Sequence, residues 1–482
     1  MNQLQLRIIA QDFKSAHEAD NRTDLVIAAR KLVALKAPLG PQWAQVAGAV
    51  YRWRELDLAI GALKMWADQV APKEAADFQT AAYLSDAGVM DRAREYLRRV
   101  PASHPNPAAH AYLAASIEFT SGRLDAAENL YREVLRLEET NGRAWLGLAQ
   151  VGRANSADLA RMETIADERR IKPEDRAFIY QSIGMVKDKL KDVEGAFVAL
   201  QQTRTVLSAA REYDVLDDRA SMRTAMEWGH GNIEKLAQRP PLALRKPIFV
   251  TGLPRSGTTL VQQILSAHSA VDGGKEFGLA VQLEATVNGF APNSVVKFLR
   301  EGGSVAFLRD LYLRLVQERE PGGGAFVDKS LHLSRALGPM SVLFPESPII
   351  WLRREPLDQA WSIYRTWLGV SIAAWTLEDI AHHMQLEDQL LEHWTRELPT
   401  RVLEVPYRQL VEKPAEWIER ITTHCGLEVE AQQFEFHRQS GSVTTASALQ
   451  VREPINRRGI GSAEPYREFL KPFIDAYEGR KG

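Results

Sequence analysis

The first half of the chain repeats with a period of 34 residues, and this period constrains the fold more than any other feature. Alanines recur at two positions of the period, first Ala47, Ala81, Ala115 and Ala149, and then Ala59, Ala93 and Ala127. Larger residues recur at a third position, Leu63, Leu97 and Tyr131. Gly88 and Gly122 lie at a turn between them, with Arg54 in the matching place one period earlier. Small residues let antiparallel helices cross closely, and larger ones fill the groove between the helices. The period therefore predicts an all-helical region of stacked helix pairs.

A helix pair with this period and pattern resembles the tetratricopeptide repeat. The clearest copy runs from Ala108 to Asn141, and a later copy resumes with Gly184, Ala196 and Leu200 in register, after a degenerate stretch from residue 152 to 173. We expect about five copies with an atypical helix at each end, in a domain that spans residues 1–240. Stacked repeats form a superhelix whose concave face commonly binds a peptide or protein. The array could equally support the second domain or form a homodimer, because repeat identity does not say what is bound.

A strand, a glycine-rich turn and a helix are predicted in succession around the sequence KPIFVTGLPRSGTT. Residues 248–250 form a β-branched and aromatic run that is typical of a buried strand. The next six residues begin and end with glycine, and from Thr258 onward the apolar residues follow helical spacing. This order brings backbone N–H groups and a helix N-terminus to one point. Such an arrangement binds phosphate or sulfate oxygens.

The loop differs from the nucleotide-binding loop GxxxxGK[ST] at one decisive position. Gly252 and Gly257 match its two glycines, but Thr258 replaces the lysine that reaches the β- and γ-phosphates. Arg255 supplies a positive charge earlier in the loop, and its fork suits an anion held through two hydrogen bonds. An enzyme that cleaves a γ-phosphate would lack its main transition-state cation here. The loop is therefore predicted to bind an anion without being suited to kinase chemistry.

The sequence PRSGTT after a strand resembles the 5′-phosphosulfate loop of sulfotransferases, which use 3′-phosphoadenosine-5′-phosphosulfate (PAPS) as the sulfuryl donor. This version resembles the tyrosylprotein-sulfotransferase branch and its bacterial relatives that carry tetratricopeptide repeats. The resemblance implies that the 5′-phosphosulfate is held by Arg255, Ser256, Gly257, Thr258 and Thr259. Arg255 would also take part in catalysis.

Alternating strands and helices after the loop predict a parallel sheet with helices on both faces. Further strand-like runs are Phe326 to Ser330, Pro348 to Arg354 and Arg401 to Tyr407. Helical stretches separate these runs, for example residues 358–367 and 377–398. The predicted fold class is thus an all-α domain followed by a P-loop-like α/β domain over residues 241–482. Because ligands of such sheets bind beyond the carboxyl ends of the strands, residues at those ends are expected to converge on one crevice.

A second motif, IIWLRREPLDQAWSIYR, begins at the end of a predicted strand. The resemblance implies that Arg354 and Ser362 hold the 3′-phosphate of PAPS, which selects PAPS over ATP. Arg353 competes for this role, but the spacing to Ser362 favours Arg354. Alternatively, these arginines cap a helix or pair with Glu355. Tyr407, in VPYRQLV, matches a tyrosine of the family that contacts the nucleotide.

The attack of a hydroxyl on sulfur needs a base near the loop. Glu276, in VDGGKEFGL, resembles the catalytic glutamate of the tyrosylprotein-sulfotransferase relatives. Lys329, in FVDKSLHL, matches the family lysine that stabilises charge on the bridging oxygen. A purely structural interpretation pairs Glu276 with Lys275 and Lys329 with Asp328.

Two histidines are alternative bases, because cytosolic sulfotransferases use histidine in this role. His332 and His268 are the candidates, but neither occupies the setting of the glutamate. A lone histidine is more often structural than catalytic. They are therefore second choices.

The last segment, TASALQVREPINRRGIGSAEPYREFL, resembles the C-terminal lid of the family. Ser447 matches a serine that contacts the sulfuryl donor. Relatives carry a basic residue and a tryptophan just after the Gly-Ile-Gly stretch, where this chain has Ser462 and Ala463. Arg457 and Arg458 could supply the charge from a turn earlier.

Composition limits the remaining classes of function. The net charge of −2 gives no bulk attraction to nucleic acid or to an anionic membrane, so neither is an expected partner. Cys425 is the single cysteine, and no cysteine and histidine cluster has zinc-ligand spacing, so no metal is expected. The first residues lack a basic region followed by an apolar core, and no long apolar span occurs later. These features favour a cytoplasmic location.

The residues and the resemblance together predict a PAPS-dependent sulfotransferase. It would move the sulfuryl group to an acceptor hydroxyl and release 3′-phosphoadenosine-5′-phosphate (PAP). The acceptor could be a peptide tyrosine recognised with the repeats, and a sugar or small-molecule hydroxyl fits the same chemistry. Two other classes stay open: a scaffold that binds nucleotide without turnover, and a nucleotide kinase on the same sheet.

Overall fold

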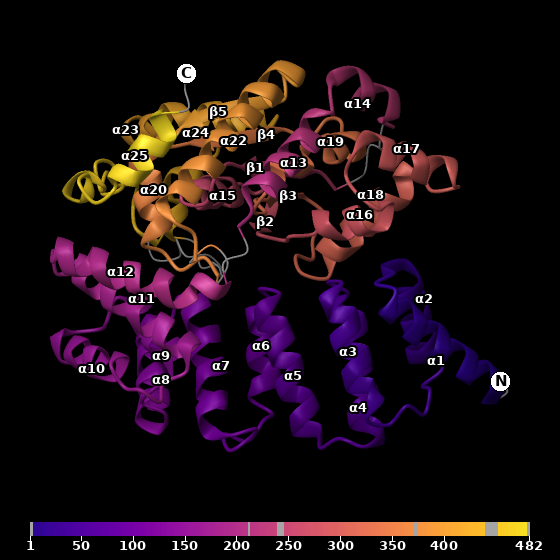
Figure 1. Cartoon of the computed structure of the whole chain (residues 1–482). Coiled ribbons are helices and arrows are strands. Elements are labelled where there is room, and N and C mark those ends of the chain that lie inside the picture. The colour runs from indigo at the N-terminus through magenta and orange to yellow at the C-terminus, as the bar shows by residue number, and fades with distance from the viewer. Residues whose placement is uncertain are drawn as a thin grey trace.

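The computed structural model describes residues 3–210, 213–238, 245–369, 372, 374–438 and 452–479. An all-helical N-terminal part lies beneath an α/β part that contains one parallel sheet (Figure 1). The predicted fold class, all-α followed by α/β with a parallel sheet, is confirmed.

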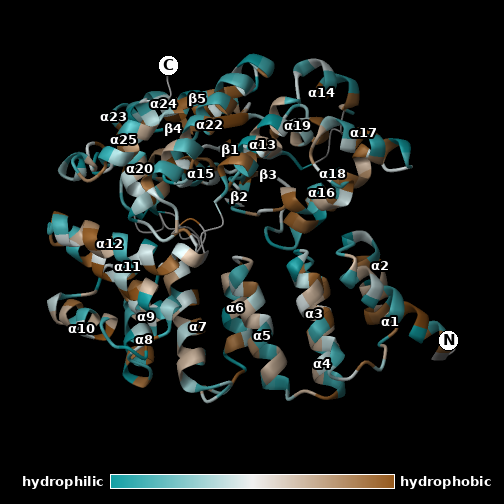
Figure 2. Cartoon of the chain, in the orientation of Figure 1, coloured by the Kyte–Doolittle hydropathy of each residue, from teal (hydrophilic) through white to brown (hydrophobic). Residues whose placement is uncertain are grey.

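The N-terminal part is built from helices that pack in sequence order, mostly as adjacent pairs. They are α1 (Gln3–Glu18), α2 (Arg22–Ala34), α3 (Gln42–Arg52), α4 (Leu56–Gln69), α5 (Lys73–Asp86), α6 (Met90–Leu97), α7 (Pro107–Thr120), α8 (Leu124–Leu137), α9 (Gly142–Val151), α10 (Ser156–Ala166), α11 (Pro173–Lys189) and α12 (Val193–Leu207). Hydrophilic and hydrophobic residues alternate around these helices, as expected for helices with one buried face (Figure 2).

The 34-residue period coincides with these helix pairs. The first set of recurring alanines lies in α3, α5, α7 and α9, the second in α4, α6 and α8, and all of them are buried. Gly88 and Gly122 occupy the turns within two pairs with φ of 75° and 79°, a conformation that glycine adopts without strain. Gly184 lets α11 pack closely against α12. A Cβ at this position would lie only 2.6 Å from the side chain of Leu200.

Asparagine side chains define the start of several helices. Asn106 accepts a hydrogen bond from the N–H of Ala109, and Pro107 follows at the first helical position. Asn155 and Asp158 form a reciprocal capping box at the start of α10. The degenerate stretch of the repeat pattern therefore still contains a well-capped helix.

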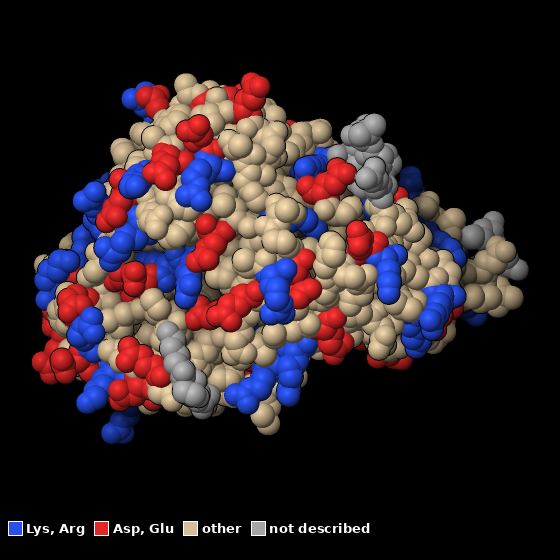
Figure 3. Space-filling view, turned by 90° about the horizontal axis from the view of Figure 1, so that it is seen from above, with Lys and Arg blue, Asp and Glu red and all other residues tan. Residues whose placement is uncertain are grey.

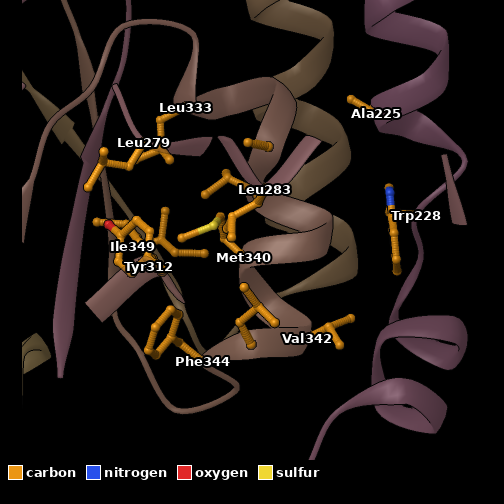
Figure 4. Close-up of a cluster of buried hydrophobic side chains, with 14 of the residues drawn as sticks. Ala225, Trp228, Leu279, Leu283, Tyr312, Leu333, Met340, Val342, Phe344 and Ile349 are labelled. Carbon is orange, nitrogen blue, oxygen red and sulfur yellow. The ribbon is translucent and has the colours of Figure 1, made fainter. Parts of the chain in front are cut away.

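The helices that follow α12 belong to the core of the α/β part. They are α13 (Val215–Met226) and α14 (His230–Leu236), and the short helix η1 (Ser208–Ala210) precedes them. Ala225 and Trp228 face the apolar cluster that includes Met340 and Phe344 (Figure 4). The indole of Trp228 is fully buried, and its Nε1–H donates to the Phe290 carbonyl at 2.6 Å. The predicted boundary at residues 240 and 241 lies outside the described residues. Buried residues of α12 pack with residues of the α/β part, so one hydrophobic cluster spans both parts of the chain.

The sheet has the strand order β2-β3-β1-β4-β5, and every neighbouring pair is parallel. The strands are β1 (Pro247–Thr251), β2 (Val271–Lys275), β3 (Ala325–Asp328), β4 (Ile349–Arg353) and β5 (Val402–Pro406). Four of these match predicted runs, whereas β2 was not predicted because VDGGK shows no apolar run. In β2, Gly274 lies so close to Val327 of β3 that a Cβ would come within 2.6 Å of its side chain.

Helices cover both faces of the sheet, as predicted. Ile248 and Val250 of β1 point into one apolar cluster, and Phe249 between them points into another. The helices are α15 (Thr258–Ser266), α16 (Ala280–Val287), α17 (Pro292–Arg300), α18 (Val305–Gln317), α19 (Leu333–Leu343), α20 (Pro356–Tyr364), α22 (Leu377–Glu397), α23 (Tyr407–Glu412), α24 (Pro414–His424), η2 (Ala431–Arg438), η4 (Glu464–Tyr466) and α25 (Lys471–Glu478). None of the helices in the described part of the chain is both long and apolar enough to cross a bilayer.

Buried polar contacts join the two parts of the chain near the N-terminus. Glu55 accepts hydrogen bonds from Arg22 at 2.5 Å and from Arg314 of α18 at 2.7 Å. Burial raises the pKa of Glu55, but the hydrogen bond from Arg314 and the neighbouring arginine charges outweigh it, so the pKa is lowered overall. On the face of the molecule seen in Figure 3, acidic and basic side chains are interspersed, which agrees with the small net charge.

Candidate active site

The sequence-predicted site residues follow the carboxyl ends of different strands of one sheet. The loop with Arg255 follows the central strand β1. Glu276 and Lys329 follow β2 and β3 on one side of it, and Arg354 and Tyr407 lie at β4 and β5 on the other. Because all these strands are parallel, their carboxyl ends lie along the same edge. Along this edge, Glu276 and Lys329 therefore lie on one side of the loop after β1, and Arg354 and Tyr407 lie on the other side.

The loop after β1 requires its two glycines. Gly252 and Gly257 have φ of 128° and 111°. A Cβ at Gly252 would lie 2.5 Å from the carbonyl oxygen of Leu352, and one at Gly257 would lie 2.7 Å from the ring of Tyr407. Helix α15 begins directly afterwards, so its first N–H groups lie at the loop. The hydroxyl of Ser256 is fully buried and has no hydrogen-bond partner among the described residues. A buried polar atom of this kind indicates a site for a ligand.

Three arginines meet behind this loop. Arg255 Nε donates to the hydroxyl of Ser362 at 3.1 Å, and Arg354 Nη1 donates to the carbonyl of Arg255 at 2.9 Å. Desolvation, followed by repulsion from Arg365 and Arg354, lowers the pKa of Arg255 to about 9. Burial likewise lowers the pKa of Arg354, and its Nε has no partner among the described residues. Clustered cations in a poorly solvated place favour a multivalent anion as ligand.

A cavity of about 760 Å³ opens at these arginines. Arg255, Gly257, Thr259, Ser362 and Tyr407 are among the residues that line it. The structure thus brings the loop and the predicted 3′-phosphate residues to one space. The predicted partnership of Ser362 with Arg354 differs in detail, because the serine hydroxyl contacts Arg255 instead.

Residues of the predicted C-terminal lid line one side of the cavity. Arg354 Nη2 donates to the Gly459 carbonyl at 2.5 Å and lies 3.4 Å from the hydroxyl of Ser462. The N–H groups of Gly461 and Ala463 donate to the carboxylate of Asp358 in α20, at 2.8 and 2.9 Å. Ser462 and Ala463, where the sequence departs from the family pattern, therefore belong to an ordered turn held by Asp358.

Glu276 and Lys329 form an ion pair with each other, with Nζ to Oε1 at 2.7 Å. The lysine side chain is fully buried, whereas that of Glu276 is 33% exposed. The alternative pairs considered from the sequence are wrong. Lys275 pairs with Glu320 at 3.2 Å, and Asp328 accepts hydrogen bonds from Tyr312 and Ser330. Glu276 is thus the one of the two residues that remains accessible to a substrate.

Comparison with known proteins agrees with this geometry. The model of a family described as "Sulfotransferase family" matches residues 247–431. Residues 247–431 therefore match a sulfotransferase family domain. An "Uncharacterized protein" of Aquifex aeolicus is 28% identical over 338 residues, which cover 67% of this chain and 44% of that protein. A "Putative protein-tyrosine sulfotransferase" of Caenorhabditis briggsae is 25% identical over 235 residues, which cover 45% of this chain and 79% of that protein.

The chain is also similar to solved structures, at lower sequence identity. The sulfotransferase domain of the Synechococcus PCC 7002 olefin synthase covers 49% of this chain and 98% of its own, with 18% identity and a TM-score of 0.36. A retinol dehydratase solved with androsterone and the inactive cofactor PAP covers 52% of this chain and 86% of its own, with 17% identity and a TM-score of 0.26.

The two alternative bases lie in different places in the α/β part of the chain. His268 precedes β2 and contacts the Glu428 carbonyl through Nε2 at 2.8 Å, so it lies away from the carboxyl edge. His332 follows β3 and begins α19 with φ of 60°, at the same edge as Lys329. Although part of it is exposed, desolvation, then the charges of His383 and Arg335, lower its pKa to about 4. Such a ring is neutral at pH 7 and weakly basic.

The remaining predicted contacts divide between the cavity and its surroundings. Arg458 lines the cavity and pairs with Glu453, whereas Arg457 is exposed and is not among the lining residues. Thr258 begins α15 without lining the cavity. Ser447 lies outside the described residues. Arg353, the competitor of Arg354, is half-exposed and lies 3.7 Å from both Asp388 and Glu404.

The N-terminal helices also contribute to the cavity, which the sequence did not predict. Asp188, Lys189, Lys191 and Val193, at the turn between α11 and α12, line the same cavity as the loop. Arg365 lines it as well. No motif marks these residues, because their position at the cavity depends on contacts between separate parts of the chain.

Proposed function

We propose that the protein transfers a sulfuryl group from PAPS to an acceptor hydroxyl and releases PAP. The observation that carries this proposal is the meeting of Arg255 and Arg354 behind a glycine-rich loop and a helix N-terminus. A sulfuryl donor with a 5′-phosphosulfate and a 3′-phosphate suits this charge pattern. The hydroxyl of Ser256 and Nε of Arg354, which have no hydrogen-bond partner among the described residues, are further groups available to its oxygens. The loop lacks the lysine of a kinase, which argues against γ-phosphate transfer.

We further propose roles for the chain at each end of the cavity. The loop N–H groups and Arg255 hold the 5′-phosphosulfate, and Arg354 holds the 3′-phosphate. Ser362 acts through Arg255, whose guanidinium it contacts at 3.1 Å. Tyr407 supports Arg354, because its ring lies 5.2 Å from the guanidinium carbon and limits where that group can lie.

The transfer step uses the pair formed by Glu276 and Lys329. The acceptor oxygen attacks sulfur as the bond from sulfur to the bridging oxygen breaks, so PAP leaves with that oxygen. Glu276 takes the hydroxyl proton of the acceptor. Lys329 stabilises the negative charge on the departing oxygen. Since Oε1 of Glu276 already accepts from Lys329, we assign the proton to Oε2.

The acceptor is proposed to be a peptide or protein hydroxyl, with tyrosine as the leading residue. The similarity to the Caenorhabditis briggsae protein and the glutamate in the position of the base support this choice. A sugar or small-molecule hydroxyl is the competing class. Measuring PAP release from PAPS with tyrosine peptides, sugars and simple phenols as acceptors separates these classes.

The decisive experiment is a calorimetric titration of the full chain with PAP, with ATP and ADP as controls. We expect PAP alone to bind tightly, and Arg354→Ala to weaken it by about 10- to 100-fold, the effect of losing a charge-assisted hydrogen bond. Arg353→Ala is the matched control, since it removes the same charge one residue away and outside the site. Preference for ATP would contradict the proposal and favour a kinase. PAP binding without turnover on any acceptor would favour a nucleotide-binding scaffold.

A further inference from the structure

The turn between α11 and α12 brings the N-terminal helices to the cavity of the sulfotransferase domain. Asp188, near the end of α11, accepts a hydrogen bond from Arg365 at 2.6 Å and another from the hydroxyl of Tyr466 at 2.6 Å. Gln181 of the same helix donates to the Arg365 carbonyl at 2.8 Å. These contacts tie α11 to the segment after α20 and to η4. The turn is therefore held at the mouth of the cavity.

Lys191 in this turn has a backbone conformation that a lysine rarely adopts. Its φ is 67°, in the left-handed region. It is the second residue after the end of α11, and the residues in the same position after α5 and α7 are Gly88 and Gly122, with φ of 75° and 79°. Arg54, in the same position after α3, and Lys36, after α2, also have left-handed φ, of 60° and 47°. Such a turn thus accepts a basic residue, and here it places Lys191 among the residues that line the cavity.

The charges around Lys191 favour an anion as its partner. Lys191 lines the cavity together with Arg255 and Arg354, and the carboxylate of Asp188, which also lines it, is paired with Arg365. No ion pair of Lys191 occurs within the described part of the chain, whereas the nearby Lys187 pairs with Glu163 at 2.8 Å. Lys189 has its Nζ bonded to the Gly152 carbonyl at 2.7 Å. The ammonium group of Lys191 is thus the one in this turn that can reach a bound anion.

We propose that Lys191 binds the anionic sulfuryl donor, so that the N-terminal helical part completes the donor site. Asp188 is the positioning residue in this arrangement, because it holds both the turn and Arg365. The inference rests on the proposed function, in which the cavity holds PAPS and then PAP. It adds that the helical part contributes to binding of the sulfuryl donor itself, whatever acceptor it recognises.

The test is a calorimetric titration of full-length variants with PAP, together with thermal unfolding. Lys191→Ala is expected to weaken PAP binding by about tenfold, the effect of losing one charge-assisted hydrogen bond. Lys191→Gly should weaken it equally while its unfolding temperature does not fall, because glycine relieves the left-handed strain. Lys187→Ala removes the same charge outside the cavity and should bind PAP like the unaltered chain. Lys191→Arg should retain most of the affinity.

Each outcome has a distinct meaning. If the unaltered chain does not bind PAP, the proposed function fails and this inference fails with it. If the unaltered chain binds PAP and Lys191→Gly binds it equally well, the inference alone is overturned. An affinity loss in Lys191→Gly without a loss of thermal stability supports the direct role. An equal loss of PAP affinity in Lys187→Ala would overturn the direct role of Lys191. The loss would then come from the lower positive charge of the helical part as a whole.

Discussion

Lys329 Nζ and Glu276 Oε1 lie 2.7 Å apart, and these two residues follow neighbouring strands of the sheet. The fully buried ammonium holds a carboxylate that is one-third exposed. The carboxylate of Glu276 therefore lies at the surface, where it can accept a proton, and the ammonium group of Lys329 lies in the interior. The proposed chemistry needs both, the first for the hydroxyl proton and the second for the departing oxygen.

Replacing Glu276 with glutamine should abolish most of the turnover without changing affinity for PAP. The amide keeps the size of the side chain and an oxygen for Lys329 but cannot take the hydroxyl proton. We expect kcat to fall by about 10²- to 10⁴-fold, the usual contribution of a general base. Steady-state PAP release and PAP titration measure the two effects. Glu320→Gln, at the carboxylate that pairs with Lys275, is the control. Unchanged turnover in Glu276→Gln would exclude it as the base.

Replacing Asp358 with alanine should weaken binding of PAP because the lid loses its anchor. Asp358 accepts the N–H groups of Gly461 and Ala463 within a turn that also contacts Arg354. We expect the Kd for PAP to rise by about tenfold, since two hydrogen bonds to a charged group are lost. Titration calorimetry measures this. Glu355→Ala alters an exposed carboxylate at the start of the same helix and should leave the Kd unchanged. An unaffected Kd in Asp358→Ala would show that the lid turn does not contribute to the site.

Replacing Gly257 with alanine should lower the stability of the fold by more than the backbone strain alone, and should weaken binding of PAP. A left-handed non-glycine residue costs about 1–3 kcal/mol, and here the added Cβ would also lie 2.7 Å from the ring of Tyr407. Gly302→Ala is the matched control, because Gly302 has a φ of 96° but no atom within 4 Å of its Cβ position. Denaturant unfolding and PAP titration compare the two variants. Equal destabilisation with unchanged PAP affinity would mean that the contact with Tyr407 is unimportant.

Replacing Glu55 with glutamine should destabilise the contact between the two parts of the chain and reduce its sensitivity to acid. The pKa of Glu55 is lowered in the folded state. Its ionic contacts therefore stabilise the fold above the unfolded pKa of about 4.3, and this stability is lost as the pH falls below that value. We expect Glu55→Gln to cost about 3–5 kcal/mol at neutral pH, because Arg22 stays buried without its partner.

Urea unfolding at several pH values measures this effect. The difference between the unaltered chain and Glu55→Gln should shrink as the pH falls below about 4. Glu18→Gln, in an exposed pair with Lys14, should change stability by less than about 1 kcal/mol. A difference that stays constant with pH would show that the charge of Glu55 is not what stabilises the contact.

Local features of the chain could be predicted from the sequence. The 34-residue period predicted the helix pairs because each crossing point needs a small residue at a regular distance along the chain. The apolar run at residues 248–250 predicted the strand. Gly252 and Gly257 predicted the loop after it, because glycine tolerates the backbone angles found at these two positions. The positions of Arg354 and Tyr407 at strand ends followed from alternating strands and helices.

Other features depended on contacts between distant parts of the chain. The pairing of Glu276 with Lys329 follows from β2 and β3 being neighbours, and β2 itself has no apolar run because Gly274 packs against Val327. The contact of Ser362 with Arg255 likewise joins residues that are far apart in sequence.

The sequence by itself determined the helix pairs, four of the five strands of the sheet and the places where glycine must turn the chain, because these depend on spacing and local backbone energetics. Only the tertiary structure decided which charges meet. Lys191 and Asp188 reach the cavity because α11 packs on the segment after α20, and Asp358 meets the lid because the chain returns there at its end. Hydrogen bonds and ion pairs need their partners within a few ångströms in space, and the separation of two residues along the chain does not determine whether they come that close.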